Sequence, residues 1–345
     1  MPKRIEKTVF LILVALVVIS THLYITFFTP ASREGGARTV YIQKGTGFRM
    51  VAENLEKAGV VRDAESFIYA ARLLGAYKKV QAGEYEFDRS MTPLEILNAL
   101  TKGKVKKHLV TIPEGYNIQE VAEVLSEEGL ADPGDFTAKA TDRYFVATLG
   151  LEGRTLEGYL FPDTYSLTRG MTVEEIITKM VDKFKTVYTA EFDSAARAKG
   201  MSMRTVVTLA SIIEKETGAP EERDLISAVF HNRLKNRIKL QSDPTVIYDI
   251  KDFDGNLTKK HLLAKTPYNT YVNYGLPPGP IANPGKASLK AAISPARADY
   301  LYFVSRNNGT HQFSSSLKDH NRAVDSFQRK HRTRSSPTAA ASPKS

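Results

Sequence analysis

The chain has 345 residues, of which 42% are hydrophobic and none is cysteine, and its formal net charge is +10. This length and apolar content allow two or three folded domains and exclude a wholly disordered chain. Without cysteine there is no disulfide scaffold, Fe–S cluster, thiolate zinc site or cysteine nucleophile.

The positive charge is concentrated at the two ends of the chain. Residues 329–345 carry five basic and no acidic side chains, and residues 1–7 carry a net charge of +2. The body between them, 8–328, therefore holds only +3 of the total. A nearly balanced body does not resemble a phosphate-binding surface, so we expect no nucleic-acid partner.

The first predicted element is an apolar helix. No charged residue occurs from Thr8 to Ser32, a run of 25 residues, and a membrane-spanning helix needs about 20. With basic residues before it, the run predicts a transmembrane signal-anchor over 8–29, a cytoplasmic stub over 1–7 and an exported remainder, joined by a tether over 30–38. The alternative is a cleaved signal peptide, whose apolar region is usually shorter, about 7–15 residues.

An internal repeat follows, with an offset of 70 residues. Ile42-Gln-Lys-Gly45 matches Ile112-Pro-Glu-Gly115, and the same offset relates the next apolar positions, Val51 and Leu55, to Val121 and Leu125. Each copy predicts a strand, a glycine turn and an amphipathic helix closed by glycine. Two copies indicate paired small α/β modules, over 39–104 and 105–152, because a solenoid usually needs at least three repeats.

The third predicted region, 153–330, is mixed but rich in helices. Helical patterns cover 172–188, 190–199 and Ser202 to Thr217, and Asn307-Asn-Gly309 between two short strands is typical of a hairpin. A Ser/Pro/Ala-rich basic tail, 331–345, is expected to be disordered. The predicted fold class is therefore α+β: a transmembrane helix, small modules and a mixed α/β domain.

Glu214 is the leading catalytic candidate. It closes the apolar run from Val206 to Ile213, and a helix that is apolar on all sides is buried. Burial without a fixed counter-charge raises the pKa of a carboxyl group and keeps the proton that a general acid needs. From this segment alone, a solvated Glu214 at the start of a polar last turn is the safer interpretation. Glu216 points to a different side of the helix, so no helix-borne pair is expected.

Further polar residues could bind a substrate, although each also has an ordinary structural explanation. Asn232 lies on an apolar helix face and needs a partner, while Asp243 before Pro244 could simply cap a helix. The stiff Pro/Gly loop from Gly275 to Gly285 and the tyrosines between 248 and 302 suit close approach to sugar rings. The candidates are Asn232, Gln241, Asp243, Tyr248, Asn269 and Tyr271.

Other chemistries lack their motifs. The sequence has no GxxxxGK[ST] loop, no complete dinucleotide fingerprint, no HExxH and no GxSxG elbow, and its seven histidines are scattered. We expect no metal and no cofactor, and His311 and His320 are expected to be ordinary polar residues. Carboxylate acid–base chemistry remains.

Several collinear motifs resemble the YceG-like family of endolytic murein transglycosylases. They are Leu209-Ala-Ser-Ile-Ile-Glu-Lys-Glu216, Asn232-Arg-Leu234, Leu240-Gln-Ser-Asp-Pro-Thr-Val246, Tyr268-Asn-Thr-Tyr271 and Gly275-Leu-Pro-Pro-Gly-Pro-Ile281. The resemblance covers nearly the whole chain, including the anchor and a LysM-like region. It implies a single-pass enzyme of the bacterial inner membrane, with a periplasmic bulk, that cuts peptidoglycan glycan strands. Peptidoglycan synthases or divisome proteins are further candidate partners.

The resemblance also assigns the chemistry. The family's catalytic glutamate maps to Glu214, which would protonate the glycosidic oxygen and then accept the proton of the muramic acid's own 6-hydroxyl, leaving a 1,6-anhydro end. No second carboxylate is then required, although Glu216, Glu157 or Asp243 could lie nearby. Two alternatives stay open: a glycoside hydrolase with two carboxylates, and a non-catalytic, membrane-anchored protein that binds peptidoglycan.

Overall fold

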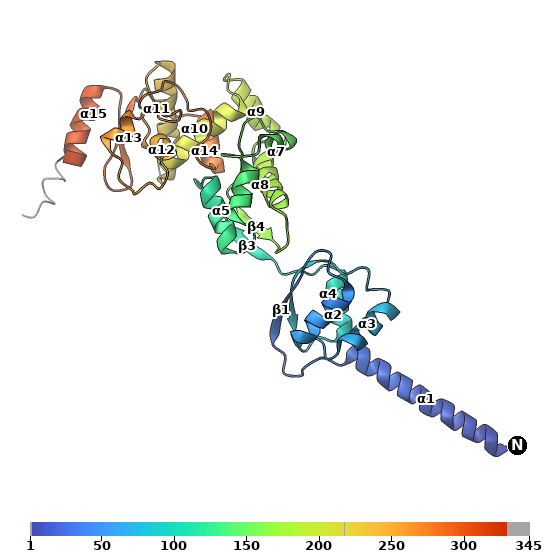
Figure 1. Ribbon diagram of the computed structural model, residues 1–345. Coiled ribbons are helices and arrows are strands. Elements are labelled where there is room, and N and C mark those ends of the chain that lie inside the picture. Colours follow the sequence, from blue (N-terminus) through green and yellow to red (C-terminus); the bar gives the residue numbers. More distant parts are fainter. Residues whose placement is uncertain (1, 217, 330–345) are drawn as a thin grey trace, which may run out of the picture. The chain divides into compact units, whose positions relative to one another are not determined.

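The computed structural model describes residues 2–216 and 218–329, and the predicted tail 331–345 lies outside them (Figure 1). The chain divides into two compact units. Unit 1 comprises Met1–Leu109, Glu128–Leu130 and Ser166–Thr172, and unit 2 comprises Val110–Glu127, Ala131–Tyr165 and Val173–Ser345. Most of the second predicted module thus belongs to the same unit as the predicted catalytic region.

Unit 1 begins with the long helix α1 (Pro2–Phe28). Its segment Lys7–Phe28 has a mean hydropathy of 2.4 and is, within the described ranges, the one helix long and apolar enough to cross a membrane. The last turn of α1 belongs to the core of unit 1, because Thr26 and Phe27 are buried there.

The segment after α1, predicted as a tether, is bonded to unit 1 instead. Arg62 Nε donates to the carbonyl of Pro30 (2.8 Å), and the backbone N–H of Ser32 donates to the carbonyl of Arg89 (3.1 Å). The chain then enters the first strand at Ala37. No free linker therefore separates α1 from the folded part of unit 1.

The rest of unit 1 has the order β-α-α-β-α. Its elements are β1 (Ala37–Ile42), α2 (Phe48–Lys57), α3 (Ala64–Leu73), β2 (Gly83–Asp88) and α4 (Pro93–Thr101). β1 and β2 are antiparallel, with Val40 opposite Tyr85, and both side chains are buried. Thr92 and Glu95 form a capping box that starts α4. The likeness to LysM modules stays a prediction.

The second copy of the repeat has a similar element order. Its elements are β3 (His108–Thr111), α5 (Ile118–Glu127), α6 (Pro133–Ala140), α7 (Arg143–Thr148) and β4 (Thr164–Leu167), and β3 pairs with β4. Positions at the 70-residue offset are buried in both copies, Leu55 like Leu125. Gly59 and Gly129 follow the matching helices with φ of 68° and 64°, the left-handed conformation that favours glycine.

The remainder of unit 2 is mainly helical. Its elements are α8 (Val173–Val187), α9 (Ala190–Arg197), α10 (Met203–Glu216), the 3₁₀ helix η1 (Pro220–Glu222), α11 (Arg223–Lys235), α12 (Asp243–Ile247), α13 (Lys259–Leu263), α14 (Lys286–Ile293), β5 (Tyr302–Ser305), β6 (His311–Ser314), α15 (Leu317–Val324) and the π-helical turn η2 (Asp325–Arg329). β5 and β6 are antiparallel, so the predicted hairpin is confirmed.

Helix α10 is the centre of this part, and it contacts α9, α11, α12 and α14. Every residue from Val206 to Ile213 is buried, as the apolar run predicts. Ser202 supplies the start of the helix, because its Oγ accepts the backbone N–H of Thr205 (3.2 Å). The helix therefore carries its C-terminal residues from the core to the surface of unit 2.

Candidate functional site

Two glutamates leave the C-terminal end of α10, and the structure gives them different surroundings. Glu214 and Glu216 are two positions apart, which is about 200° around the helix axis. Their carboxyl groups consequently meet different elements, and they need separate descriptions.

The carboxylate of Glu214 is held on both oxygens. Oε1 accepts a hydrogen bond from the guanidinium of Arg223 (3.1 Å), and Oε2 accepts the backbone N–H of Gly285 (2.9 Å). Gly285 is the N-cap of α14, so the carboxylate lies at the positive end of that helix dipole. The side chain of Glu214 is only 5% exposed.

This arrangement corrects one premise of the sequence interpretation. A buried carboxyl group without a fixed counter-charge was expected at Glu214, whereas Arg223 supplies that charge from the first turn of α11. Glu214 is buried, so the solvated interpretation that the segment alone favoured is wrong. Its partners occupy both carboxyl oxygens and join α10 to α11 and α14.

Glu114 is the second carboxylate beside Glu214. Its Oε2 lies 3.7 Å from Arg223, and a Cβ atom placed on Gly285 would overlap its carboxyl group. Partial burial, and then the negative charge of Glu214, raise the pKa of Glu114, and Arg223 opposes them. The two carboxylates therefore share one guanidinium, a pairing that the sequence did not indicate.

Glu216 lies on the wall of a polar cavity of about 410 Å³ in unit 2. The cavity is lined by Glu216, Arg233, Leu240, Gln241, Asp243, Tyr271, Phe303, Val304, Ser305, His311, His320, Val324 and Gln328. The carboxyl group is half-buried, and its Oε1 accepts a hydrogen bond from Ser242 Oγ (2.5 Å). Segments between residue 216 and residue 328 thus line one cavity together with this carboxyl group.

The surroundings of Glu216 suit proton transfer near neutral pH. Burial raises the pKa of Glu216 to about 7, and the negative charge of Asp243 acts in the same direction. The hydrogen bond from Ser242 and the charge of Arg233 oppose this shift. A carboxyl group with such a pKa is populated in both protonation states at neutral pH, as an acid that later acts as a base requires.

Arg233 is fixed in the wall of the cavity. Its Nε donates to the carbonyl of Leu301 (2.6 Å), one terminal nitrogen donates to the carbonyl of Leu240 (2.7 Å), and the guanidinium lies over the ring of Tyr302. The residue is only 8% exposed. A positive charge held this firmly can stabilise negative charge in the cavity without reorganisation.

His311 and His320, expected from the sequence to be ordinary polar residues, also line the cavity. His311 bonds Glu222 through its backbone N–H (2.8 Å) and through Nδ1 (2.6 Å). The ring of His320 stacks on Tyr302, and burial together with Arg233 lowers the pKa of His320. His320 therefore faces the cavity as a neutral imidazole at neutral pH.

Three of the six predicted binding residues come together here: Gln241, Asp243 and Tyr271. Tyr271 donates its hydroxyl to Asp243 Oδ1 (2.6 Å). Asp243 opens α12 with Ser242, not Asp243, at the N-cap. Gln241 has φ of 50°, an uncommon backbone conformation for a residue with a side chain, and its N–H bonds the carbonyl of Thr270.

The other three predicted binding residues use their polar atoms within the chain. Asn232 donates both amide hydrogens to the carbonyls of Ala298 and Tyr300 (2.8 and 2.9 Å). Asn269 is fully buried and bonds carbonyls between residues 261 and 264. Tyr248 donates its hydroxyl to Glu157 Oε2 (3.0 Å). These contacts fix the loops around the cavity, and the structural explanation accounts for each.

Glu157 is a buried carboxyl group, 3% exposed. Its Oε2 accepts from Tyr248 and from the backbone N–H of Ile118 (3.3 Å), and within the described residues its Oε1 has no hydrogen-bond partner. Burial raises the pKa of Glu157 to about 8. The group is thus largely protonated at neutral pH, but it does not line the Glu216 cavity.

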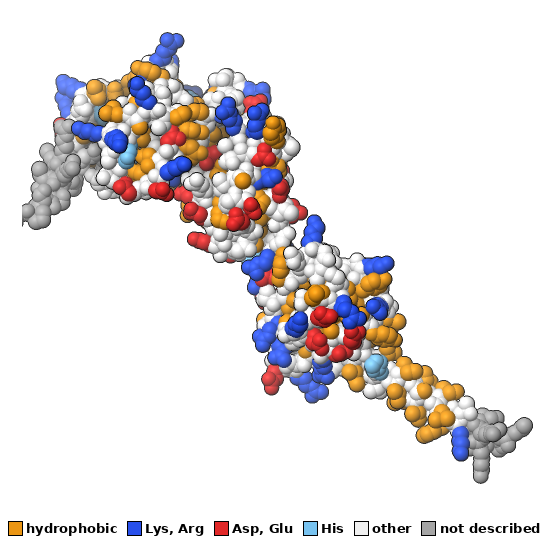
Figure 2. Space-filling view, in the orientation of Figure 1, with side chains coloured by type: hydrophobic (Ala, Val, Ile, Leu, Met, Phe, Trp, Pro, Cys, Tyr) orange, Lys and Arg blue, Asp and Glu red, His pale blue; other side chains and the backbone are white. Residues whose placement is uncertain are grey.

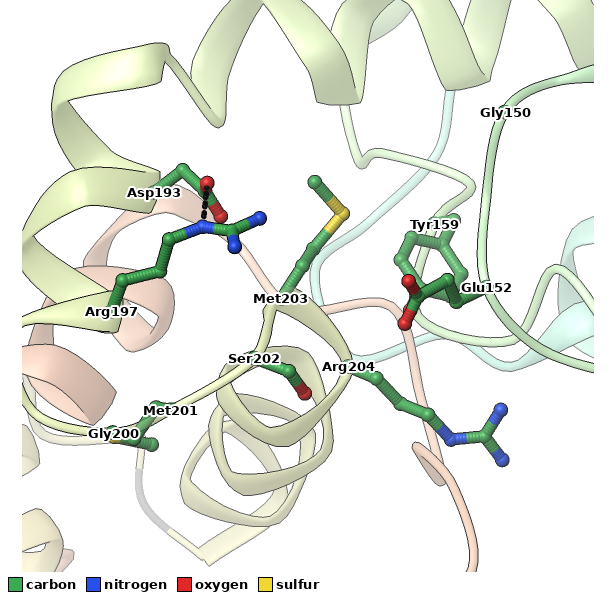
Figure 3. A pocket seen from close by; sticks show the side chains of 10 residues that line it. All are labelled: Gly150, Glu152, Tyr159, Asp193, Arg197, Gly200, Met201, Ser202, Met203 and Arg204. Carbon is green, nitrogen blue, oxygen red and sulfur yellow. Dashed lines mark hydrogen bonds and ion pairs between the residues drawn. The ribbon is translucent and has the colours of Figure 1, made fainter.

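A second cavity, of about 540 Å³, lies at the other end of α10 (Figure 3). Its carboxylates are Glu152 and Asp193, and Asp193 is already paired with Arg197 (2.6 Å). Glu152, Tyr159 and Arg204 line the same cavity (Figure 3). Neither carboxylate is buried, so this cavity lacks the protonated acid that the Glu216 cavity holds.

Sequence reasoning missed Glu216, Ser242, Arg233 and both histidines as cavity residues. An apolar run on all sides of α10 predicts burial for whichever residue ends it, so it cannot distinguish Glu214 from Glu216. The available signal was Arg233 in Asn232-Arg-Leu234, because a buried arginine needs anionic or carbonyl partners.

Comparisons with a family model and with curated proteins all point to the YceG-like family. The YceG-like family model matches residues 40–326. A curated endolytic murein transglycosylase of Bacillus subtilis (strain 168) is 34% identical over 303 residues, covering 84% of each chain. One of Streptococcus pneumoniae (strain ATCC BAA-255 / R6) is 31% identical over 322 residues, and the match covers 83% of this chain and 57% of that relative.

A solved structure of the same family is also similar to this chain. A YceG-like protein of Listeria monocytogenes has a TM-score of 0.59 and 32% identity, covering 84% of this chain and 99% of that one. The mixed α/β architecture found here matches it. With the family model spanning most of its length, this chain belongs to the YceG-like family.

Proposed function

We propose that this chain is a membrane-anchored endolytic murein transglycosylase with Glu216 as its acid and base. The observation that carries the proposal is the half-buried carboxyl group of Glu216, whose pKa burial raises to about 7, on the wall of a polar cavity. The names of the relatives support peptidoglycan as the substrate. The sequence assignment to Glu214 becomes the competing one, since Arg223 and Gly285 hold that carboxylate.

The proposed reaction uses one carboxyl group twice. Protonated Glu216 donates its proton to the oxygen that joins N-acetylmuramic acid to N-acetylglucosamine, and the bond from that oxygen to the anomeric carbon breaks. The carboxylate of Glu216 then accepts the proton of the muramic acid's 6-hydroxyl while that oxygen bonds the anomeric carbon. The strand ends in 1,6-anhydro-N-acetylmuramic acid, the proton returns to Glu216, and no water is consumed.

The cavity walls favour both steps. Burial keeps Glu216 protonated for the first step. Ser242 Oγ and the charge of Arg233 stabilise its carboxylate for the second. Tyr271 and Gln241 line the same cavity and are the proposed substrate contacts.

The products test this proposal. Purified murein digested with the full chain should give glycan ends that mass spectrometry finds lighter by one water than reducing ends. Reducing ends would instead favour a two-carboxylate hydrolase, for which Asp243 on the same wall is the second group. Murein that is bound without new ends would favour the non-catalytic alternative.

The proposed location is the inner membrane, with α1 crossing once and the bulk of the chain in the periplasm. The length and hydropathy of α1 support this location. Because the chain lacks cysteine, a single cysteine at the exposed Leu263 should react with a membrane-impermeant maleimide on intact spheroplasts. Labelling only after lysis would contradict the orientation.

A further inference from the structure

Unit 1 is fastened to the end of α1 too closely to stand clear of a bilayer. Leu23 packs against the core of unit 1, and Thr26 and Phe27 are buried in it. Residues 8–27 form about 30 Å of helix, which equals the hydrocarbon thickness of a bilayer. If the segment from Leu23 onward left the lipid, the remaining 15 residues would span only about 22 Å. Unit 1 must therefore meet the membrane surface around this helix end.

The helix α3 contacts α1 and therefore lies near the membrane surface that unit 1 meets. Its C-terminal turn and the residues after it, 72–79, form a protruding segment that we name the α3 tip. Leu73 is 60% exposed, Leu74 is 49% and Tyr77 is 40%, which is unusual for large apolar side chains so close together. Figure 1 places α3 on the side of unit 1 where α1 enters, and Figure 2 shows hydrophobic side chains gathered there.

The charges of the α3 tip match a lipid surface. Arg72, Lys78 and Lys79 are exposed, and residues 72–79 contain no acidic side chain. The Lys78 ammonium lies over the ring of Tyr77 (5.5 Å). Tyrosine at the headgroup level, leucine below it and lysine on anionic headgroups form a common interfacial pattern.

We propose that the α3 tip inserts into the outer surface of the bilayer and binds anionic phospholipids, so that α1 and the tip together hold unit 1 on the membrane. This inference rests on the proposed anchor but not on the catalytic assignment. A single helix can rotate in the lipid and would not fix the orientation of unit 1. A second point of attachment at the α3 tip would fix that orientation.

The lack of tryptophan in the chain allows a direct test. The full chain carrying Leu73→Trp is reconstituted in vesicles of phosphatidylcholine, with and without phosphatidylglycerol, and brominated lipids serve as quenchers. The tryptophan introduced at position 73, which we call the tip reporter, should lose most of its fluorescence to the brominated lipids. The loss should be larger in the anionic vesicles. The matched control is Tyr41→Trp, on an exposed residue of β1, which Figure 1 places on the opposite side of unit 1 from α3. It should lose little emission.

Lys78→Glu combined with Lys79→Glu should reduce quenching in anionic vesicles to the level in neutral ones. Equal quenching at both reporter positions would overturn the proposal. A blue-shifted tip reporter that brominated lipids do not quench would also overturn it, because protein would then cover the tip. Retention of the chain in vesicles after alkaline carbonate washing tests the α1 anchor alone, and the murein products test the activity. A failure of either is therefore distinct from a failure of the tip.

Discussion

Glu214 and Glu216 lie at the same end of α10, but their carboxyl groups have different partners. Glu214 is 5% exposed, yet Arg223 and the N-terminus of α14 occupy both of its oxygens. Glu216 has a serine hydroxyl on one oxygen and faces a cavity. The first arrangement occupies both carboxyl oxygens and joins helices. The second places the carboxyl group on a cavity wall, where we propose that it transfers a proton. We therefore expect the partners of a carboxyl group, and not its burial alone, to decide whether it can transfer a proton.

The largest expected effect separates the two glutamates. Glu216→Gln should lower the rate of anhydro-end formation by roughly 10²–10⁴-fold, the usual contribution of a positioned acid–base group. Glu214→Gln is the matched variant on the same helix, and it should keep most of the activity of the fraction that folds. The rate of the unmodified chain should fall as pH rises through about 7, because burial raises the pKa of Glu216 to that value and the donor form is lost above it.

The opposite result would restore the sequence prediction. If Glu214→Gln abolished cleavage in a folded protein while Glu216→Gln did not, Glu214 would be the acid, and Arg223 would have to move before the reaction. Circular dichroism of both variants provides the folding control.

The next effect concerns stability. Arg223→Gln leaves the Glu214 carboxylate buried without its counter-charge, so the free energy of unfolding should fall by about 3–5 kcal/mol. Adding Glu214→Gln to the same chain should recover much of this loss, because the buried charge is then gone. Denaturant titrations of the two variants measure the difference. A double variant no more stable than Arg223→Gln would mean that the guanidinium stabilises unit 2 through Glu114 instead.

The sequence predicted the elements that depend on neighbouring residues. Ser202 starts α10 and Asn307-Asn-Gly309 turns the hairpin, because each depends on a local cap or turn conformation. The buried faces of the repeat also followed from periodicity, as Leu55 and Leu125 illustrate.

The choice between the two glutamates could not be predicted in this way. The counter-charge of Glu214 comes from Arg223 on another helix, and the wall of the Glu216 cavity comes from segments 240–243, 271 and 303–328. Only the tertiary fold brings these groups together. Likewise, the amide of Asn232 donates to the carbonyls of Ala298 and Tyr300, which lie more than sixty positions away in the sequence.

A third carboxyl group extends the comparison: among the described residues Glu157 has no ion-pair partner, and it does not line the Glu216 cavity. Burial raises the pKa of Glu157 from its ordinary 4.5 to about 8, so the folded chain binds a proton that the unfolded chain releases. Stability should therefore fall as pH rises from about 5 to 8. Glu157→Gln should reduce this slope and be more stable than the unmodified chain at pH 8, by on the order of 3 kcal/mol.

Unfolding free energies of both chains at pH 5 and pH 8 check this expectation. At pH 5 the variant should be slightly less stable, because the protonated carboxyl group is already compatible with burial. A residual slope from Glu216, whose pKa burial raises to about 7, should persist in both chains. Identical slopes for the two chains would show that Glu157 does not hold the extra proton.

The smallest expected effect tests whether the cavity works as a unit. Tyr271→Phe removes the hydroxyl that donates to Asp243 (2.6 Å), and a hydrogen bond to a charged group contributes about 1.5–3 kcal/mol. Anhydro-end formation should therefore fall by roughly tenfold or somewhat more. Tyr274→Phe, at a tyrosine 70% exposed on the next part of the same loop, is the matched control and should behave as the unmodified chain. Tyr271→Phe could instead have no effect while Glu216→Gln abolishes cleavage. The reaction would then not need the part of the cavity wall that Tyr271 and Asp243 form. The substrate would have to approach Glu216 from the side of Arg233 and β5.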